Sequence, residues 1–231
     1  MWLSIQVKAG NKIQLSKLID HTLLRPDATE ADIVKLCDEA KQYGFFSVCI
    51  HPSFIETAKR ILNKTNIKIS TVIAFPHGMT LSRIKIFEAM EAVLNGADEL
   101  DIVMNIGYAK TARWGEVERE LADLITATPA AAHKIIIETC YLADNEKAMA
   151  SAAAMNAGAE FIKTSTGFGP GGAVIEDVRL IRSVTMGKLG IKAAGGIRTL
   201  NDVMSFVSAG ATRIGTTSGV SIMKETEQTR K

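Results

Sequence analysis

The chain has 231 residues, 47% of them hydrophobic and 23% charged, which is the composition of a globular protein with a sizeable core. Its 27 Lys and Arg nearly balance 25 Asp and Glu, and aromatic residues make up only 6%, so neither a nucleic-acid partner nor a base-stacking surface is indicated. Cys37, Cys49 and Cys140 form no CxxC pair, which predicts free thiols in a reducing compartment. The N-terminus lacks the pattern of a signal peptide, and no stretch reaches the ~20 apolar residues of a membrane span. We therefore expect a cytoplasmic protein without a membrane partner.

Short apolar strands alternate with helices along the whole chain. Residues 1–17 predict a short, mainly helical leading segment that is broken at Gly10-Asn11. Predicted strands then cover residues 18–22, 45–50, 68–75, 99–104, 133–139, the stretch that carries Lys163, 190–194 and 212–216. Predicted helices cover residues 29–43, 80–95, 114–127, 144–156, 173–186 and 200–209. One more helix is predicted to begin at residues 51–53. Thr29 with Asp32 predicts a capping box at the first of these helices, and Gly44 its end.

This alternation of strand and helix predicts a parallel sheet. Gly96, Gly158 and Gly210 stand at three helix-to-strand joints, where glycine suits the turn that ends a helix. No linker or low-complexity run divides the chain. Eight strand units in this length favour a closed (β/α)8 TIM barrel over a doubly wound sheet, although the chain is slightly shorter than the roughly 250 residues usual for that fold. We expect residues 1–231 to form one barrel domain with a short N-terminal helical extension.

The stretch from Glu160 to Gly172 places a lysine in an apolar strand directly before a glycine-rich loop. A buried ammonium costs on the order of several kcal/mol unless it is paired or neutral, so Lys163 needs a reason to be there. One reason is an amine that attacks a carbonyl and forms an imine. The alternative is a lysine at the end of a strand that simply reaches solvent.

Two further charged residues fall on predicted barrel strands. In a barrel the functional side chains gather at the carboxyl ends of the strands. Period-two alternation puts Lys192 on the inward face of the strand next to that of Lys163, about 5 Å away, so one of the two amines should lose its proton more easily. Asp101 alternates with apolar Leu100 and Ile102, and can balance one lysine and relay protons. The alternative to a catalytic role for Lys163, Lys192 and Asp101 is that they form a purely structural ion pair in the core.

Glycine-rich turns follow the predicted seventh and eighth strands. Gly195 and Gly196 come after the seventh strand, and the segment from Gly215 through Thr217 and Ser218 comes after the eighth and opens a short terminal helix. Loops at these positions form the recurrent phosphate site of the TIM barrel. The pattern therefore predicts a phosphorylated small molecule as the ligand.

The histidines give no sign of a metal site. His21, His51, His77 and His133 lack metal-ligand spacing such as HxxxH, so we expect no metal and no other cofactor. Cys49 stands near the end of the second strand, where it either lines the pocket or is a packed core thiol.

Five ordered motifs give the chain a resemblance to the deoxyribose-phosphate aldolase family, over residues 18–218. They are Ile19-Asp20-His21-Thr22-Leu23-Leu24, Ser47-Val48-Cys49-Ile50, Glu99-Leu100-Asp101-Ile102-Val103, Phe161-Ile162-Lys163-Thr164-Ser165-Thr166-Gly167 and Ile191-Lys192-Ala193-Ala194-Gly195-Gly196-Ile197-Arg198. The resemblance implies a metal-free TIM-barrel lyase that cleaves 2-deoxy-D-ribose 5-phosphate to D-glyceraldehyde 3-phosphate and acetaldehyde, reversibly, in deoxyribose catabolism. It also implies a homo-oligomer, since relatives are usually dimers or tetramers.

Carried over by position, the resemblance assigns roles to individual residues. It implies that Lys163 forms the imine and that Lys192 and Asp101 relay protons. The residues that it implies for substrate binding are Asp20, Cys49, Thr166, Gly195, Gly196, Gly215, Thr217 and Ser218. Some relatives end in a mobile tail with a tyrosine that assists proton transfer, whereas no tyrosine follows Tyr141 here, so we expect that assistance to be absent or replaced. Two alternatives remain open, another imine-forming aldolase of the same barrel group and a non-catalytic phosphosugar-binding protein.

Overall fold

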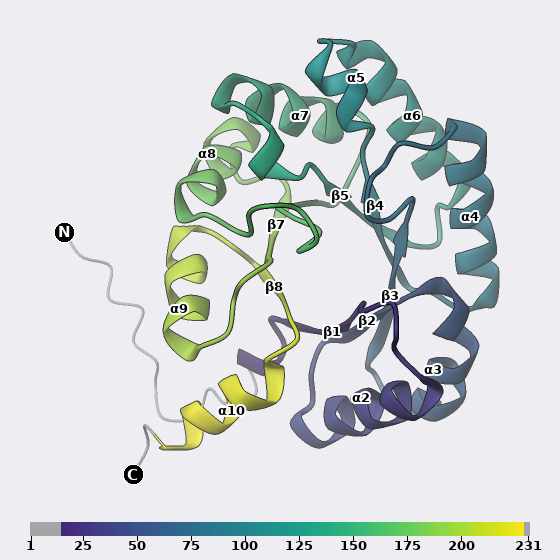
Figure 1. The fold of residues 1–231 in the computed structure, drawn as a ribbon, viewed down its shortest axis with the longest axis vertical. Coiled ribbons are helices and arrows are strands. Elements are labelled where there is room, and N and C mark those ends of the chain that lie inside the picture. The colour runs from purple at the N-terminus through teal and green to yellow at the C-terminus, as the bar shows by residue number, and fades with distance from the viewer. Residues whose placement is uncertain (1–14, 229–231) are drawn as a thin grey trace.

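The computed structural model describes residues 15–228, which form a closed barrel of eight parallel strands surrounded by helices (Figure 1). The strands follow one another around the barrel in chain order, and β1 closes it by pairing with β8. Their bounds are β1 Ile19–Leu23, β2 Ser47–Ile50, β3 Lys68–Ile73, β4 Glu99–Val103, β5 Ala132–Ile136, β6 Phe161–Lys163, β7 Gly190–Ala194 and β8 Arg213–Thr216. The predicted TIM barrel is confirmed, whereas the helical extension predicted over residues 1–17 lies almost wholly outside the described residues.

The helices occupy the predicted stretches between the strands. They are α2 Glu30–Tyr43, α3 Ile55–Leu62, α4 Ser82–Asn95, α6 Trp114–Ala127, α7 Asp144–Asn156, α8 Ile175–Thr185, α9 Leu200–Ala209 and α10 Gly219–Gln228. The sequence did not predict the five-residue helix α5 (Ile106–Lys110) or the 3-10 turns Pro52–Phe54 and Thr139–Tyr141. The strands predicted over 45–50, 68–75 and 133–139 are shorter in the structure than predicted, because apolar residues flank the paired segments. Phe45 and Phe46 precede β2, and residues 74–75 and 137–139 follow the ends of β3 and β5. Among residues 15–228, no helix is both long and apolar enough to cross a membrane.

Helix α2 shows why the predicted boundaries hold. The Thr29 side chain accepts a hydrogen bond from the Asp32 N–H, and the Asp32 carboxylate accepts one from the Thr29 N–H. This capping box satisfies two N–H groups that an uncapped helix would leave without partners. At the other end Gly44 adopts φ 66°, the left-handed conformation that ends a helix most easily at glycine.

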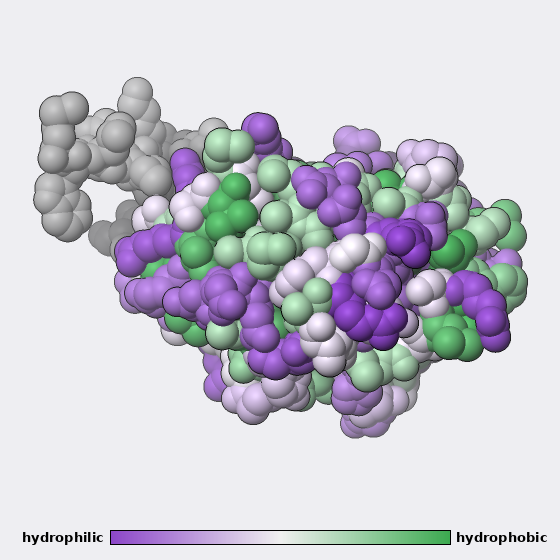
Figure 2. All heavy atoms as spheres, turned by 90° about the horizontal axis from the view of Figure 1, so that it is seen from above, coloured by the Kyte–Doolittle hydropathy of each residue, from purple (hydrophilic) through white to green (hydrophobic). Residues whose placement is uncertain are grey.

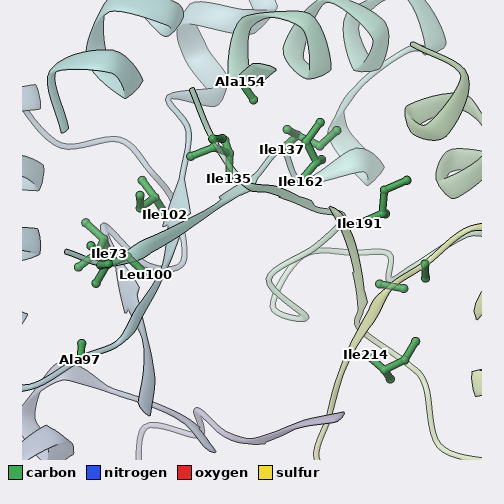
Figure 3. Packing of buried hydrophobic residues seen from close by; sticks show 14 of the residues in the cluster. Ile73, Ala97, Leu100, Ile102, Ile135, Ile137, Ala154, Ile162, Ile191 and Ile214 are labelled. Carbon is green, nitrogen blue, oxygen red and sulfur yellow. The ribbon is translucent and has the colours of Figure 1, made fainter. Parts of the chain in front are cut away.

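The main hydrophobic core lies between the strands and the helices, and a smaller cluster of Leu24, Cys49 and Val72 is separate from it. Figure 3 shows Leu100 and Ile102 of β4, with Ile135, Ile162 and Ile191 of the following strands, pointing outward from the barrel toward the helices. Each fully buried side chain of this size contributes about 1.5–3 kcal/mol to folding. Because alternate residues of a strand point to opposite faces, the residues between these apolar ones must face the barrel interior. In four adjacent strands those interior positions hold charged side chains.

Candidate active site

Two lysines stand side by side in the barrel and share one carboxylate. Lys163, the last residue of β6, is in register with Lys192 of β7. The Lys163 Nζ lies 2.8 Å and the Lys192 Nζ 2.7 Å from Oδ2 of Asp101, which projects from β4. All three side chains are buried. The structure thus confirms the inward faces and the adjacency that the alternation predicted.

The second oxygen of Asp101 is held by residues that the sequence reasoning did not single out. Asp101 Oδ1 accepts hydrogen bonds from Lys134 Nζ at 2.9 Å and from Ser70 Oγ at 3.1 Å. Burial alone would raise the pKa of Asp101, but the charges of Lys134, Lys163 and Lys192 outweigh it and hold the pKa well below its usual range. Asp101 is therefore a carboxylate whose orientation is fixed on both sides.

Lys192 contacts two carboxylates at once. Besides Asp101, its Nζ lies 2.6 Å from Oδ2 of Asp20, on the far side of the closure between β1 and β8. Burial would lower the pKa of Lys192, but Asp101 and Asp20 raise it above the ordinary lysine value. Lys192 is therefore charged at neutral pH, and it is a permanent positive neighbour of Lys163.

A second layer of charges lies deeper in the barrel, toward the amino ends of the strands. Arg213 of β8 donates to Asp20 Oδ1 at 2.8 Å and lies 3.1 Å from Glu99 Oε2. Lys134 Nζ also contacts Glu99, at 2.7 Å, and Ser47 Oγ donates to Asp20 Oδ1 at 2.7 Å. These contacts join five strands, β1, β2, β4, β5 and β8, and fix the positions of the Asp20 and Asp101 carboxylates.

The pocket above these charges has a volume of about 320 Å³. Lys163 is on its lining, together with Thr166, Gly195, Gly196, Gly215 and Thr217, as the resemblance implied for a substrate site. The structure places Asp20 and Cys49 differently: both are fully buried and neither is on the lining. Asp20 contacts the buried Lys192, and Cys49 Sγ lies 3.7 Å from Asp101 Oδ2. Burial raises the pKa of the Cys49 thiol.

One wall of the pocket is built from the two glycine-rich turns. Gly195 and Gly196 have φ of 94° and 82°, which few other residues adopt, and the structure leaves open space where a Cβ of Gly196 would lie. Neither the Gly196 N–H nor the Thr217 N–H is donated to another group within residues 15–228. Helix α10 begins two residues after Thr217, so its positive end lies close to the same wall. Ser218 is not on the lining, and its N–H is donated to Thr216 Oγ1 at 2.9 Å.

Another wall is the loop that follows Lys163, and hydrogen bonds to Glu138 hold this loop in place. Glu138 is buried at the end of β5 in a left-handed conformation (φ 50°, ψ 68°). Its carboxylate accepts a short hydrogen bond from the Thr166 hydroxyl and others from the Thr166 N–H, at 3.2 Å. Phe168, further along the loop, packs edge-on against Phe75 with ring centroids 5.3 Å apart. The pocket is therefore polar on the glycine side and aromatic on the other.

The sequence did carry a signal for the residues that were missed. Lys134, Glu99 and Arg213 are charged residues inside short apolar strands, the same feature that singled out Lys163. Functional side chains are expected toward the carboxyl ends of strands, whereas Lys134 is the second residue of the strand predicted over 133–139, and Glu99 and Arg213 stand at strand starts. Within residues 15–228, no cluster of three or more His, Cys, Asp or Glu side chains is arranged to hold a metal ion.

The chain is similar to known proteins in both sequence and structure. The sequence model of the DeoC/LacD family aldolases matches residues 15–226. Deoxyribose-phosphate aldolase of Thermococcus gammatolerans is 50% identical over 216 residues, which cover 92% of this chain and 96% of that protein.

Among solved structures, a putative deoxyribose-phosphate aldolase from Coccidioides immitis superposes with a TM-score of 0.92 at 38% identity, covering 93% of this chain and 86% of that one. Deoxyribose phosphate aldolase from Aeropyrum pernix, described as a unique tetrameric structure, gives 0.89 at 32% identity, covering 95% and 94%. The matches run over nearly the whole of both partners, and the matched region contains every residue of the charged cluster and of the pocket. The chain belongs to the DeoC/LacD family of aldolases.

Proposed function

We propose that the protein is a lysine-dependent aldolase that reversibly cleaves 2-deoxy-D-ribose 5-phosphate to D-glyceraldehyde 3-phosphate and acetaldehyde. The observation that carries the proposal is the position of Lys163. Its amine is the lysine nitrogen on the pocket lining, and it rests on a carboxylate that also holds a second, charged lysine. The names of the relatives supply the substrate, and the wall of free N–H groups suits its phosphate.

The charge balance of the barrel interior supports Lys163 as the nucleophile. Four cationic side chains (Lys134, Lys163, Lys192 and Arg213) meet three carboxylates (Asp20, Glu99 and Asp101) within the described barrel. The buried charges cancel when one of the four cations is neutral. Lys134 contacts three carboxylates, and Lys192 and Arg213 contact two each, whereas Lys163 contacts one and opens onto the pocket, so Lys163 is the cation with the fewest ionic partners.

The proposed reaction uses each member of the cluster once. The neutral Lys163 amine attacks C1 of the open-chain sugar and forms an imine, which draws electrons from the C2–C3 bond. A water held by Asp101 and Lys192 takes the proton of the C3 hydroxyl, and the C2–C3 bond breaks to release glyceraldehyde 3-phosphate. The enamine that remains is protonated at C2 and hydrolysed to acetaldehyde, which restores Lys163. In the reverse direction the same enamine attacks the aldehyde of glyceraldehyde 3-phosphate.

The phosphate of the substrate would occupy the glycine wall. The Gly196 and Thr217 N–H groups and the N-terminal end of α10 offer hydrogen bonds and partial positive charge there. We assign Thr166, Gly195 and Gly215 to the substrate site because they share this lining, and Asp20, Cys49 and Ser218 to its supporting layer. In keeping with the substrate, we propose that the protein works in deoxyribose catabolism in the cytoplasm, as a homo-oligomer.

Trapping of the imine tests the assignment of Lys163. Borohydride added with acetaldehyde should reduce the imine and leave a two-carbon adduct on Lys163, and Lys163→Arg should abolish it. Lys192→Leu should lower turnover by orders of magnitude yet still permit slow trapping at position 163, because the nucleophile remains. An adduct found by peptide mapping on Lys192 would reverse the two roles, and no acetaldehyde release from deoxyribose 5-phosphate would refute the activity.

A further inference from the structure

Glu138 is a buried acidic residue that the proposed reaction does not use. It is 1% exposed, and its carboxylate forms no ion pair within residues 15–228. Charged side chains normally lie in water, and hydrophilic residues indeed cover much of the molecular face seen in Figure 2. A carboxylate removed from water without a cation is unfavourable unless hydrogen bonds compensate it. The hydrogen-bond partners of Glu138 therefore indicate what this residue does.

Most hydrogen bonds of the Glu138 carboxylate come from the loop that follows Lys163. The Thr166 N–H is donated to both carboxylate oxygens at 3.2 Å, and the Thr166 hydroxyl is donated to Oε2. The Cys140 thiol is a more distant donor, with its Sγ 3.8 Å from Glu138 Oε1. Thr166 Oγ1 accepts in turn from the Phe168 N–H at 3.0 Å. Glu138 thus fixes Thr166, and through Thr166 it fixes the turn that carries Phe168.

The backbone of Glu138 adopts a conformation that is unfavourable for residues other than glycine. Its φ of 50° and ψ of 68° lie in the left-handed region. The next residue is tied to the end of β6, because the Thr139 N–H is donated to the Thr164 carbonyl at 2.9 Å. Such conformations persist only where the surrounding contacts hold them, and they cluster at functional sites. A buried carboxylate and a strained backbone therefore coincide in one residue that contacts the pocket lining.

The loop held by Glu138 connects the imine-forming lysine to the glycine wall. It begins after Lys163, and at its far end the Ala173 N–H is donated to the Gly195 carbonyl at 3.0 Å. Lys163, Thr166 and Gly195 all line the same pocket. Deoxyribose 5-phosphate must reach both Lys163 and the glycine wall at once, whereas acetaldehyde needs only Lys163. The position of this loop therefore affects the two molecules differently.

From these contacts we propose that Glu138 is a positioning residue for the phosphorylated substrate. By holding Thr166, it keeps the loop where one sugar phosphate can contact Lys163 and the glycine wall together, and it does not itself touch the substrate. The inference rests on the proposed aldolase function. A purely structural Glu138 would differ in one respect, because its loss would slow every reaction at Lys163 to the same extent.

The variant Glu138→Gln tests the proposal, because glutamine keeps the size of the side chain and removes its charge. KM for deoxyribose 5-phosphate should rise about 10-fold, since the N–H and the hydroxyl of Thr166 lose a charged acceptor. The rate at which borohydride traps acetaldehyde on Lys163 should stay within about 2-fold of the parent's rate. Glu160→Gln is the matched control, because Glu160 also accepts a backbone N–H, from His133 at 2.8 Å, but is not on the pocket lining. Its KM should equal that of the parent.

A second variant shows whether Glu138 acts through Thr166. In a Thr166→Val chain, which lacks the hydroxyl donor, the change Glu138→Gln should raise KM by less than about 3-fold. If Glu138→Gln folds poorly, Glu138→Asp gives the same test, because aspartate keeps the charge but is one methylene too short to hold Thr166 in the same way. KM should again rise while trapping of acetaldehyde persists.

Two results for the Glu138 variants would overturn the proposal: the parent's KM, or a trapping rate that falls as much as KM rises. A rise in KM of equal size with and without the Thr166 hydroxyl would also contradict it. If the parent protein formed no adduct on Lys163, the proposed function itself would be refuted, so the two failures are distinguishable.

Discussion

Lys134 shows how a residue that the pocket does not expose can control the site. It lies in the middle of β5, contacts Asp101 and Glu99, and is completely buried. Burial would lower the pKa of Lys134, but Asp101, with Asp20 and Glu99, raises it. Its bond to Asp101 Oδ1 leaves Oδ2 for the two lysines on the neighbouring strands, so Lys134 orients the carboxylate without touching the substrate.

Replacement of Lys134 by Met should destabilise the fold strongly. Removal of one partner from a buried ion pair leaves an uncompensated charge, which costs about 3–5 kcal/mol. Urea unfolding followed by circular dichroism measures the change. Lys68→Met is the matched control, because Lys68 forms an exposed pair with Asp98 at 2.9 Å and should change stability by less than about 1 kcal/mol. Equal changes in the free energy of unfolding for the two substitutions would show that the buried ion pairs of Lys134 stabilise the fold no more than an exposed pair does.

His21 should make stability depend on pH near neutrality. Its side chain is buried beside Glu39, its Nδ1 has no hydrogen-bond partner within the described residues, and burial lowers its pKa. Because the folded pKa lies below the unfolded value of about 6.5, the unfolded chain binds the proton more readily. Stability is therefore complete above about pH 6.5 and falls as the pH drops toward the folded pKa, by at most about 1.4 kcal/mol per pH unit.

The variant His21→Gln isolates this contribution. Unfolding free energies measured from about pH 7 to about pH 5 should decline less steeply for the variant than for the parent. His77→Gln, which changes an exposed histidine, should follow the parent's slope. Parallel slopes for the parent and His21→Gln would contradict the assignment.

Among the helices and strands, the sequence predicted the elements that recur regularly along the chain. It missed the short helix α5, which depends on local hydrogen bonds. The eight strands and their helices follow from hydrophobic alternation and from glycines at helix ends, features that many residues repeat. Helix α5 has five residues, too few for a period to be visible, and it depends on the Asn105 side chain, which accepts a hydrogen bond from the Tyr108 N–H.

The candidate site was predictable only in part for a related reason. Alternation indicates which side chains face the interior, so the meeting of Lys163, Lys192 and Asp101 could be predicted. The position of a side chain along the barrel axis depends on the stagger between neighbouring strands, which cannot be deduced from the sequence. The sequence therefore could not show that Asp20 and Cys49 are absent from the pocket lining.

Gly172 couples the loop after Lys163 to the glycine wall. A Cβ at this position would lie 2.7 Å from the Gly195 carbonyl carbon, a backbone atom that cannot move without moving the wall. Gly172→Ala should therefore raise KM for deoxyribose 5-phosphate about 10-fold, in line with the cost of overpacking. Trapping of acetaldehyde on Lys163 should persist, since that reaction needs no phosphate.

Gly115→Ala provides the control, because nothing lies within 4 Å of a Cβ at Gly115. Its KM should equal that of the parent. A Gly172→Ala variant with the parent's KM would place the phosphate away from this wall.

For the molecule as a whole, the proposed chemistry predicts independence from metal ions. The imine on Lys163 supplies the electron withdrawal for which other aldolases need a metal Lewis acid. Dialysis against excess chelator should leave the rate of acetaldehyde release unchanged. If chelation abolished the activity and added zinc restored it, the lysine mechanism would be contradicted.

The closure of the barrel between β1 and β8 has a consequence for synthesis on the ribosome. Asp20 meets its partner Arg213 across 193 residues of chain, and both bury charges that the other neutralises. A nascent chain that has released β1 through β7 already holds Lys192 for Asp20 and Lys134 for Glu99, but it still lacks the guanidinium that contacts both carboxylates. Its charged interior stays open to water, and translation of the last strand becomes the event that lets the protein complete its structure.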